Sequence, residues 1–462
     1  MNTPTTLQSN QSNLTKKAIL HELENDSVQK VKVALSDIDG ILRGKVLHID
    51  KFTNSIDDNF GFCDVIFGWD SNDRCYDNVD HTGWHTGYPD ANAKLDLSTF
   101  RRIPWDQYTP FFLVDLEKKD GTPLEITPRN LLKKIRGQSI AAGFHPFYSA
   151  EYEWFNFDET SEELHQKNFQ DPRTLTKGMF GYSVVRSSQN SDYFNALFDE
   201  LNQFGIPLEG LHTETGPGVY EAAILYDDVL EAADRAILFK TSVKEIAHRF
   251  GIIPTFMARW SPNYAGSGGH IHQSLWDLEK EQNLFYDSKG MSPTMKHFIA
   301  GQLHCLPYIL PMYAPTVNSY KRLVEGYWAP TTVSWGIDNR TVAIRVLPGG
   351  KKSTRVEMRV VGADANPYLA MAASLASGLY GIKHKLNLTI PETKANGYNR
   401  KEQGCLARSL DEATQLMKSS EIPCELFGET FVKHFVQTRE WEWREFLKAI
   451  TDWEFKRYFE AI

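Results

Sequence analysis

The sequence is poor in cysteine and lacks any apolar run long enough to cross a membrane. The cysteines are odd in number and scattered, with no pair at metal-site spacing: Cys63, Cys75, Cys305, Cys405 and Cys424. A disulfide scaffold and a cysteine-zinc module are therefore excluded, and we expect free thiols in a cytoplasmic protein. Residues 1–14 are polar and lack the apolar core of a signal peptide, so we expect a disordered N-terminal arm.

An excess of positive charge is also missing. The 462 residues carry 50 Lys and Arg against 59 Asp and Glu, a net charge of −9. Domains that bind nucleic acid are usually basic, so we expect no nucleic-acid partner, and no membrane partner either. With 41% hydrophobic and 24% charged residues, the composition is that of an ordinary globular protein.

The order of strand and helix patterns predicts an α+β fold in two domains. Val31, Val33 and Leu35 alternate with other residues as in a strand, Asp39-Gly40 marks a turn, and residues 41–49 form a second strand. Turn residues at 120–123 mark a boundary, which gives a small sheet-containing domain (15–121) and a larger domain (122–462). Helices are predicted at 228–250 and from the N-cap Asn366 onward.

Acidic residues and histidines recur at the spacing of strands. Residues 147–155 read as a strand with Glu151 and Glu153 on one face, and Arg355, Glu357 and Arg359 alternate with apolar residues in the same way. Two further acids, Glu214 and Glu221, flank a glycine-rich segment, and His270 and His272 lie on either side of Ile271. Adjacent carboxylates repel each other unless a cation lies between them.

Positive charge is concentrated near residues 321–359 of this acidic chain. The basic residues are Lys321, Arg322, Arg340, Arg345, Lys352, Arg355 and Arg359. Arginine suits bidentate binding of phosphate and carboxylate groups. The glycine-rich segment 266–274 is not a Walker loop, because no Gly-Lys-Ser/Thr follows it. Acids, histidines and arginines together indicate metal-assisted phosphoryl transfer from a nucleotide.

In their joint order these segments closely resemble the glutamine synthetase family (type I-like). The specific ones are Gly266-Ser267-Gly268-Gly269-His270-Ile271-His272-Gln273-Ser274 and Asn318-Ser319-Tyr320-Lys321-Arg322. The resemblance covers almost the whole chain and is weaker before about residue 122. It implies a small β-grasp-type N-terminal domain, followed by a catalytic α+β domain with a curved antiparallel sheet.

The resemblance also implies roles for individual residues. One metal site matches Glu153, Glu214 and Glu221, and the other matches Glu151, His270 and Glu357. Nucleotide contacts match His272, Ser274, Lys352 and Arg355. Glutamate contacts match Gly266, Arg322 and Arg359. Arg340 and Arg345 match residues near the transferred phosphoryl group and, with Glu357, are the expected catalytic residues.

The implied chemistry has two steps. The γ-carboxylate of glutamate takes the terminal phosphoryl group of ATP, and a nitrogen nucleophile then displaces phosphate from γ-glutamyl phosphate. Two or three Mg²⁺ or Mn²⁺ ions per site are expected, because the ligands are mostly hard oxygens. The resemblance further implies a homo-oligomer, a dodecamer of two hexameric rings.

The sequence departs from the family at the ammonium site. Ammonia-using members carry a glutamate in a Gly-Tyr-Glu-Ala-Pro segment, and this chain has Trp328 there. The Asp-Gly-Ser-Ser motif is missing, and whether Asp70 replaces its aspartate is open; Ala265 stands where an asparagine contacts glutamate. This pattern resembles the γ-glutamyl-amide ligases, which join glutamate to an organic amine. With Trp328 lining the amine site, we expect a small alkyl or aromatic amine rather than a polyamine.

Three alternatives stay open at this point. The first is an ammonia-dependent glutamine synthetase with a rearranged ammonium site. The second is a non-catalytic structural relative, as occurs in eye lens, although six retained acidic and histidine ligands argue against it. The third is a ligase that uses another acid in place of glutamate.

Overall fold

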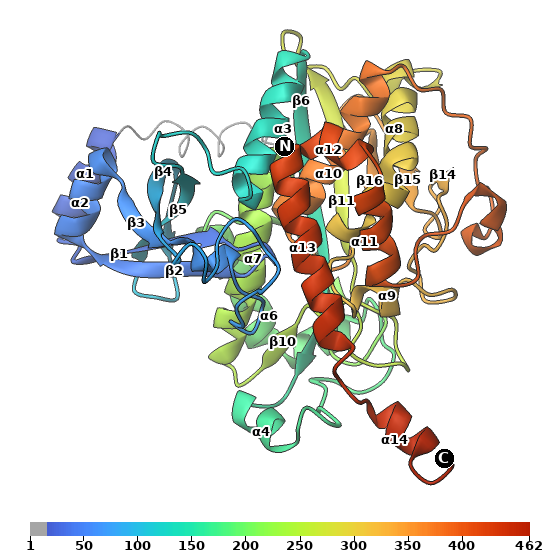
Figure 1. Ribbon diagram of the computed structural model, residues 1–462, viewed down its shortest axis with the longest axis horizontal. Coiled ribbons are helices and arrows are strands. Elements are labelled where there is room, and N and C mark those ends of the chain that lie inside the picture. Colours follow the sequence, from blue (N-terminus) through green and yellow to red (C-terminus); the bar gives the residue numbers. More distant parts are fainter. Residues whose placement is uncertain (1–15) are drawn as a thin grey trace.

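The structure is a computed structural model, and it describes residues 16–462 (Figure 1). The expected N-terminal arm, residues 1–14, therefore lies outside the described residues. None of the helices within 16–462 is both long and apolar enough to cross a membrane. All five cysteines are free, as expected.

The N-terminal part folds around a five-stranded sheet in the order β2-β1-β5-β4-β3. Its strands are β1 (Lys30–Ser36), β2 (Leu42–His48), β3 (Phe60–Cys63), β4 (Asp90–Ile103) and β5 (Thr109–Glu117). Helices α1 (Lys16–Asn25) and α2 (Ile49–Asp58) accompany it. The predicted first hairpin is confirmed: β1 and β2 pair antiparallel around a turn in which Gly40 has a φ of 80°.

The larger sheet has nine strands and carries the rest of the fold. Its main order is β14-β15-β16-β11-β6-β8-β7, and β9 and β10 also pair with β6. The strands are β6 (Phe144–Phe157), β7 (Leu208–Thr213), β8 (Val219–Ile224), β9 (Asp227–Asp228), β10 (Ile253–Thr255), β11 (Gly269–Asp277), β14 (Trp335–Ile337), β15 (Ile344–Leu347) and β16 (Arg355–Met358). All pairs are antiparallel except β14 with β15, so the predicted α+β class is confirmed.

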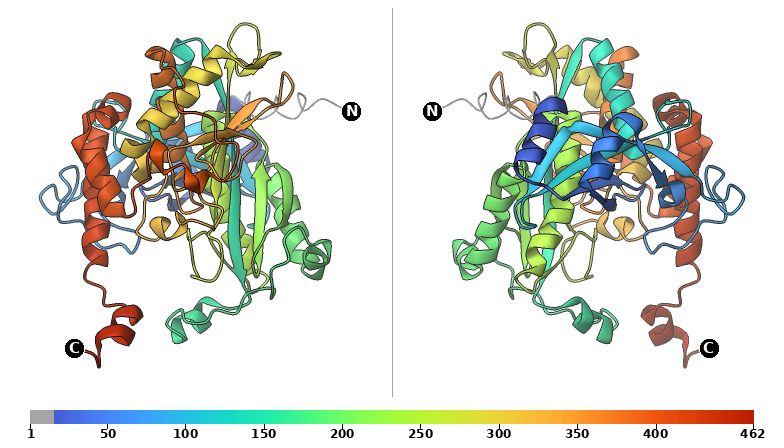
Figure 2. Two further views of the ribbon diagram at one scale, coloured as in Figure 1. Left: turned by 90° about the vertical axis from the view of Figure 1, so that its right-hand side faces the viewer. Right: turned by 90° about the vertical axis from the view of Figure 1, so that its left-hand side faces the viewer.

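Helices cover one face of this sheet and extend to one side of it (Figures 1 and 2). The helices that pack on this face, or on the helices that cover it, are α3 (Pro128–Ala141), α7 (Val229–His248), α8 (Pro293–Ile309), α10 (Pro367–Lys383), α11 (Leu410–Ser419), α12 (Ile422–Phe427) and α13 (Glu429–Phe446). The two predicted helices are confirmed. Asp228 caps α7 and Asn366 caps α10, each accepting a backbone N–H bond with its side chain.

Smaller elements decorate the periphery. They are α4 (Ser161–Gln166), α5 (Val184–Gln189), α6 (Ser191–Gln203), α9 (Ser319–Arg322), α14 (Asp452–Tyr458) and the hairpin β12 (Tyr286–Asp287) with β13 (Gly290–Met291). Helix α14 extends away from the body of the molecule at the C-terminal end (Figure 1).

A buried arginine links the five-stranded sheet to helices of the larger part. Arg129 in α3 donates to Asp234 in α7 and to Asp96 and Asp115 on β4 and β5. A buried charge of this kind is tolerated because several carboxylates surround it. The domain division proposed at residue 121 falls in the turn between β5 and α3, and it stays a prediction.

Candidate active site

The site is built on the face of the nine-stranded sheet that points away from α7. On β6, Tyr152 and Trp154 pack against Phe239 of α7, with ring centroids 5.7 and 5.5 Å away. Because side chains alternate along a strand, Glu151 and Glu153 project from the opposite face. The predicted two-sided strand is thus present, and its acidic face belongs to a cavity rather than to open solvent.

Glu357 forms the most buried part of the acidic cluster. Its side chain is 0% exposed and accepts hydrogen bonds from Arg345 Nη1, at 3.0 Å, and from Arg359 Nη1. Burial alone would raise its pKa, but Arg359 and the nearby histidines lower the pKa of Glu357 to about 2. The Arg-Glu-Arg strand is therefore not a solvated ladder of ion pairs, because two arginines converge on one buried carboxylate.

Two histidines of β11 approach Glu151. In the sheet, His270 is directly opposite Glu151, and His272 is opposite Glu357. His270 Nδ1 lies 3.2 Å from Glu151 Oε1 and 3.4 Å from Glu357 Oε1, and His272 Nε2 lies 3.6 Å from Glu151 Oε2. Burial raises the pKa of Glu151, but bonds from these histidines bring it well below its usual range.

These side chains fit a divalent metal ion. One ligand atom each from Glu151, His272 and Glu357 lie within 4.8 Å of one another. The predicted ligand set contained His270 in place of His272, and both rings reach the same carboxylates. Two carboxylates and an imidazole suit Mn²⁺ or Mg²⁺.

The other predicted set lies on the neighbouring strands β6 and β8. Glu153 and Glu221 are directly opposite each other in the sheet, and Glu214 precedes β8. Burial raises the pKa of Glu153, although Gly268 N–H donates to its Oε2 at 2.8 Å. Burial and the charges of Glu151 and Glu153 raise the pKa of Glu221 to about 7. Such mutual repulsion suits a site that a cation would neutralise.

Two residues beside this set were not predicted from the sequence as site residues. His212 Nε2 lies 3.3 Å from Glu221 Oε1, and this contact raises the pKa of the imidazole. The ring of Tyr182 stacks on His212, with centroids 4.6 Å apart. For His212, its position two residues before Glu214 was the one sequence feature that could have indicated a role in the site. Tyr182 lies in an irregular loop, and no sequence pattern indicated its role.

A cavity of about 380 Å³ brings the predicted groups together. Its lining includes the predicted residues Glu151, Glu153, Glu214, Glu221, Gly266, His270, Arg322, Trp328, Arg340, Arg345 and Arg359. Trp328 is 61% exposed and has a φ of 64°, a left-handed conformation that is rare for a bulky side chain. Arg340 is exposed and, with Trp328, forms part of the rim.

Arg322 and Gly266 are held close together at the base of this cavity. Arg322 is 3% exposed and donates to the carbonyls of Val360 and Arg359 at 2.9 and 3.2 Å. A Cβ atom at Gly266 would lie 2.1 Å from the Ala258 carbonyl and 2.9 Å from Cγ of Arg322. Glycine is therefore required at 266 so that the segment can pass beside the arginine.

A second cavity of about 160 Å³ adjoins the first, and Glu151 lines both. All four residues predicted to contact a nucleotide line it: His272, Ser274, Lys352 and Arg355. Arg355 Nε donates to His272 Nδ1 at 3.2 Å, so these two side chains orient each other. Four aromatic residues also line it and were not predicted from the sequence as part of the site: Phe147, Tyr148, Tyr226 and Trp276.

The comparisons with known proteins agree with this arrangement. The model of the glutamine synthetase catalytic domain matches residues 125–458. A Dictyostelium discoideum protein named type-1 glutamine synthetase 2 is 52% identical over 450 residues, 96% of this chain and 86% of that protein. The glutamate–isopropylamine ligase of a Pseudomonas species is 36% identical, and the match covers 95% of this chain and 97% of that protein. The γ-glutamylethanolamide synthetase GlnA4 of Streptomyces coelicolor is 34% identical, covering 94% and 93%.

A solved structure titled GmaS/ADP complex superposes with a TM-score of 0.83 at 24% identity, covering 96% of this chain and 99% of that one. This likeness confirms the fold, a mixed α+β architecture with a curled antiparallel half-barrel. The chain belongs to the glutamine synthetase family, and more narrowly its relatives include γ-glutamyl amide ligases. It is a ligase of that family, whose members use ATP and divalent metal ions.

Proposed function

We propose that this enzyme joins the γ-carboxylate of glutamate to a small organic amine, with ATP as the phosphoryl donor. The observation that carries the proposal is Trp328 on the rim of the catalytic cavity, where ammonia-using members place a glutamate. A broad apolar face suits an alkyl or aromatic amine, and a protonated amine gains about 0.5–2 kcal/mol by lying on an indole ring. The reaction would serve amine catabolism or detoxification.

The expected residue roles fit the geometry. Arg322 and Arg359 lie where they can bind the carboxylates of glutamate, and Arg340 and Arg345 can stabilise negative charge that develops at the phosphoryl group. His272, Ser274, Lys352 and Arg355 line the adjoining cavity, where they can bind ATP. Divalent metal ions held by the two acidic sets would neutralise phosphate charge during transfer.

The surroundings of Asp70 support the loss of an ammonium site. Its Oδ1 accepts the backbone N–H groups of Asn72 and Arg74, and its Oδ2 accepts Trp441 Nε1 at 3.0 Å. Asp70 is 8% exposed. With both oxygens used within its own turn and against α13, it is poorly placed to bind ammonium, so we propose that it does not replace the missing aspartate.

Relatives of both kinds bear on the choice of nitrogen donor. Two relatives are named for isopropylamine and ethanolamine derivatives, which supports an organic amine. The relative named a type-1 glutamine synthetase is 52% identical, and this observation favours ammonia as the second candidate. The two candidates differ in whether a carboxylate is needed beside the acyl phosphate to bind ammonium and accept a proton.

The deciding experiment compares kcat/KM for isopropylamine, ethanolamine, aniline and ammonia in the wild type. We expect at least one organic amine to exceed ammonia, and Trp328→Glu to shift the preference towards ammonia by about tenfold or more. Trp328→Phe is the matched control, because it keeps an aromatic face without adding a carboxylate. A wild type that prefers ammonia, or a Trp328→Glu variant with unchanged preference, would contradict the proposal.

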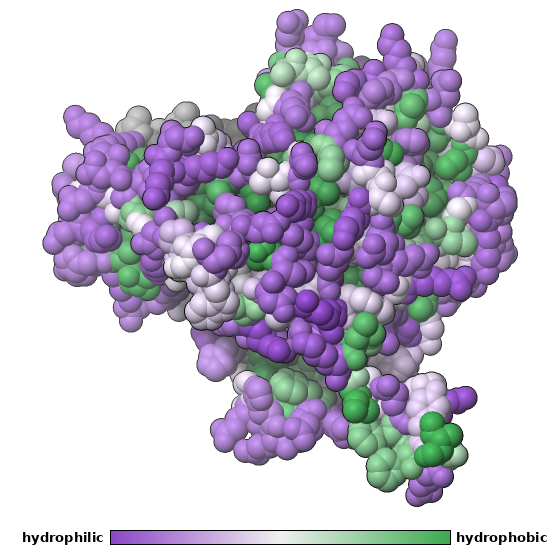
Figure 3. Space-filling view, in the orientation of Figure 1, coloured by the Kyte–Doolittle hydropathy of each residue, from purple (hydrophilic) through white to green (hydrophobic). Residues whose placement is uncertain are grey.

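We further propose a cytoplasmic homo-oligomer, a dodecamer of two hexameric rings. Helix α14 supports assembly, because Trp453 and Phe455 on it and Phe459 directly after it are 60, 51 and 75% exposed. Figure 3 shows hydrophobic surface on the C-terminal arm. Exposed aromatic surface of this kind marks an interface. Light scattering that finds a fully active monomer would contradict the proposal.

A further inference from the structure

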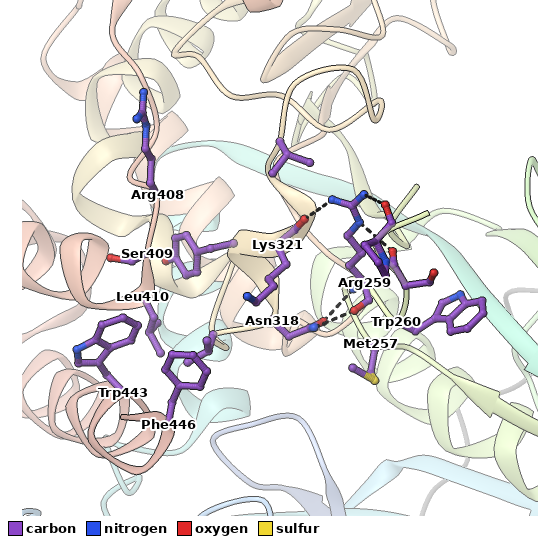
Figure 4. Close-up of a pocket in the computed structure, with 15 residues that line it drawn as sticks. Met257, Arg259, Trp260, Asn318, Lys321, Arg408, Ser409, Leu410, Trp443 and Phe446 are labelled. Atoms are coloured by element: carbon purple, nitrogen blue, oxygen red, sulfur yellow. Dashed lines mark hydrogen bonds between the residues drawn. The ribbon is translucent and has the colours of Figure 1, made fainter. Parts of the chain in front are cut away.

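A cavity of about 640 Å³ lies outside the catalytic and nucleotide cavities and is larger than either. The segment 257–262, helix α9, the start of α11 and the end of α13 enclose it (Figure 4). Trp443 and Phe446 of α13 and Leu410 of α11 form an apolar wall. A volume of this size holds a small organic molecule.

The charge on this wall is one-sided. Among the described residues that line the cavity there is no carboxylate, but there are three basic side chains, those of Arg259, Lys321 and Arg408. Within residues 16–462, the ammonium group of Lys321 has neither an ion pair nor a hydrogen bond. In Figure 4 the Lys321 side chain extends towards Trp443 and Phe446, while Arg408 points away from them. A single free cation thus faces an aromatic wall.

We propose that this cavity binds a small aromatic carboxylate. The carboxylate would accept a charge-assisted hydrogen bond from Lys321, and the ring would lie against Trp443 and Phe446. A monoanion fits better than a phosphate dianion, because the Arg259 guanidinium already donates to carbonyl groups and Arg408 points away, which leaves Lys321 as the cation that faces the aromatic wall.

An occupant here would be felt at the catalytic cavity through Arg259. Its Nη1 donates to the Lys321 carbonyl at 2.9 Å, and its guanidinium lies 4.1 Å from the ring centroid of Tyr327. Tyr327 directly precedes Trp328 and lines the catalytic cavity. A ligand that moves Lys321 therefore shifts the turn that bears Trp328. This link to amine use rests on the proposed function, whereas the binding itself does not.

Isothermal titration calorimetry of the intact protein tests the site, with phenylacetate as the probe and phenylacetamide as its uncharged counterpart. Glutamate and ADP are present at saturation, so that the catalytic and nucleotide cavities are filled. We expect phenylacetate to bind under these conditions and to bind more tightly than phenylacetamide. Absence of binding, or displacement of phenylacetate by glutamate, overturns the proposal.

Variants assign the binding to this cavity. Lys321→Met is expected to weaken phenylacetate binding about tenfold while leaving phenylacetamide unchanged. Trp443→Ala, on a different element, is expected to weaken both probes. Lys418→Met is the matched control, because Lys418 pairs with Glu440 and does not line the cavity. Equal affinities in wild type and Lys321→Met overturn the assignment even if Trp443→Ala fails to fold.

A kinetic measurement tests the link to catalysis. With phenylacetate bound, we expect the KM for the preferred amine to change at least about twofold while the KM for glutamate does not. Loss of this effect in Lys321→Met supports the path through Arg259. Binding without any change in the amine KM overturns the link, and a change that competes with glutamate overturns the separate site.

Discussion

Glu357 on β16 and Glu153 on β6 belong to one acidic cluster, but different groups balance their charges. Glu357 accepts hydrogen bonds from Arg345 and Arg359, and the charges of Arg359 and the nearby histidines keep its pKa low despite its burial. Glu153 is opposite Glu221, and the pKa values of both carboxyls are raised. The chain itself therefore balances the charge of Glu357 with hydrogen-bonded arginines, whereas Glu153 and Glu221 have no such arginine among the described residues. Glu357 is therefore expected to contribute to the stability of the fold, and Glu153 is not.

The largest expected effect is on turnover, and here both halves should behave alike. Glu153→Gln or Glu357→Gln is expected to reduce ATP- and glutamate-dependent phosphate release on the order of 10³-fold or more, because each removes a carboxylate expected to hold a divalent metal ion, and that ion would neutralise charge on the transferred phosphoryl group. Glu279→Gln, at an exposed turn, is the control. Near-normal turnover in either site variant would show that the cluster is not the catalytic centre.

Stability should separate the two halves. Glu357→Gln leaves Arg345 and Arg359 without their shared carboxylate, and breaking a buried ion pair costs about 3–5 kcal/mol. Glu153→Gln instead removes a carboxylate that burial already disfavours. In the presence of a metal chelator, calorimetry should find that Glu357→Gln clearly lowers the melting temperature relative to the wild type. Glu153→Gln should leave it unchanged or raise it. The reverse order would refute the difference in charge balance.

Added metal should reduce that contrast. Saturating Mn²⁺, at about a hundred times its dissociation constant, is expected to stabilise the wild type by about 2.7 kcal/mol, since it binds the folded state alone. Glu153→Gln should gain less, because it loses one ligand of the set that lacks arginine partners. Chelator should return both proteins to their starting melting temperatures. An equal gain in both would exclude Glu153 as a ligand.

The sequence analysis predicted which carboxylates share a strand face, but not which groups compensate their charges. Period-two alternation is enough to put Glu151 with Glu153, and His270 with His272, on one face of a strand. It cannot reveal which face is buried, so the complete burial of Glu357 between Arg345 and Arg359 appeared only in the fold. Tyr182 comes from an irregular loop, and its position depends on tertiary packing against His212. The aromatic wall that includes Phe147, Tyr226 and Trp276 likewise joins segments far apart in sequence.

The opposite face of the catalytic sheet holds a buried charge that no metal ion can balance. Lys240 of α7 is 8% exposed, and its Nζ donates to the Ala365 carbonyl at 3.1 Å. The ammonium group lies 5.9 Å from the ring centroid of Tyr152, directly behind Glu151 and Glu153. Among residues 16–462 no carboxylate forms an ion pair with it. Burial, and then the charge of Lys244, lowers the pKa of Lys240 to about 7.

Replacing Lys240 should therefore give the smallest effect, with a defined dependence on pH. The folded-state pKa lies below the unfolded value of 10.5, so charging Lys240 costs stability; the cost is complete below pH 7 and fades as pH rises towards 10.5. Lys240→Met removes the cost but loses one hydrogen bond, so we expect a net gain of about 1–2 kcal/mol at pH 6 and less at pH 9. Lys240→Arg stays charged at both values and should be destabilising at both. Melting temperatures at pH 6 and pH 9 measure these differences, and an equal loss of stability in Lys240→Met at both would mean that the bond to Ala365 outweighs the burial of charge.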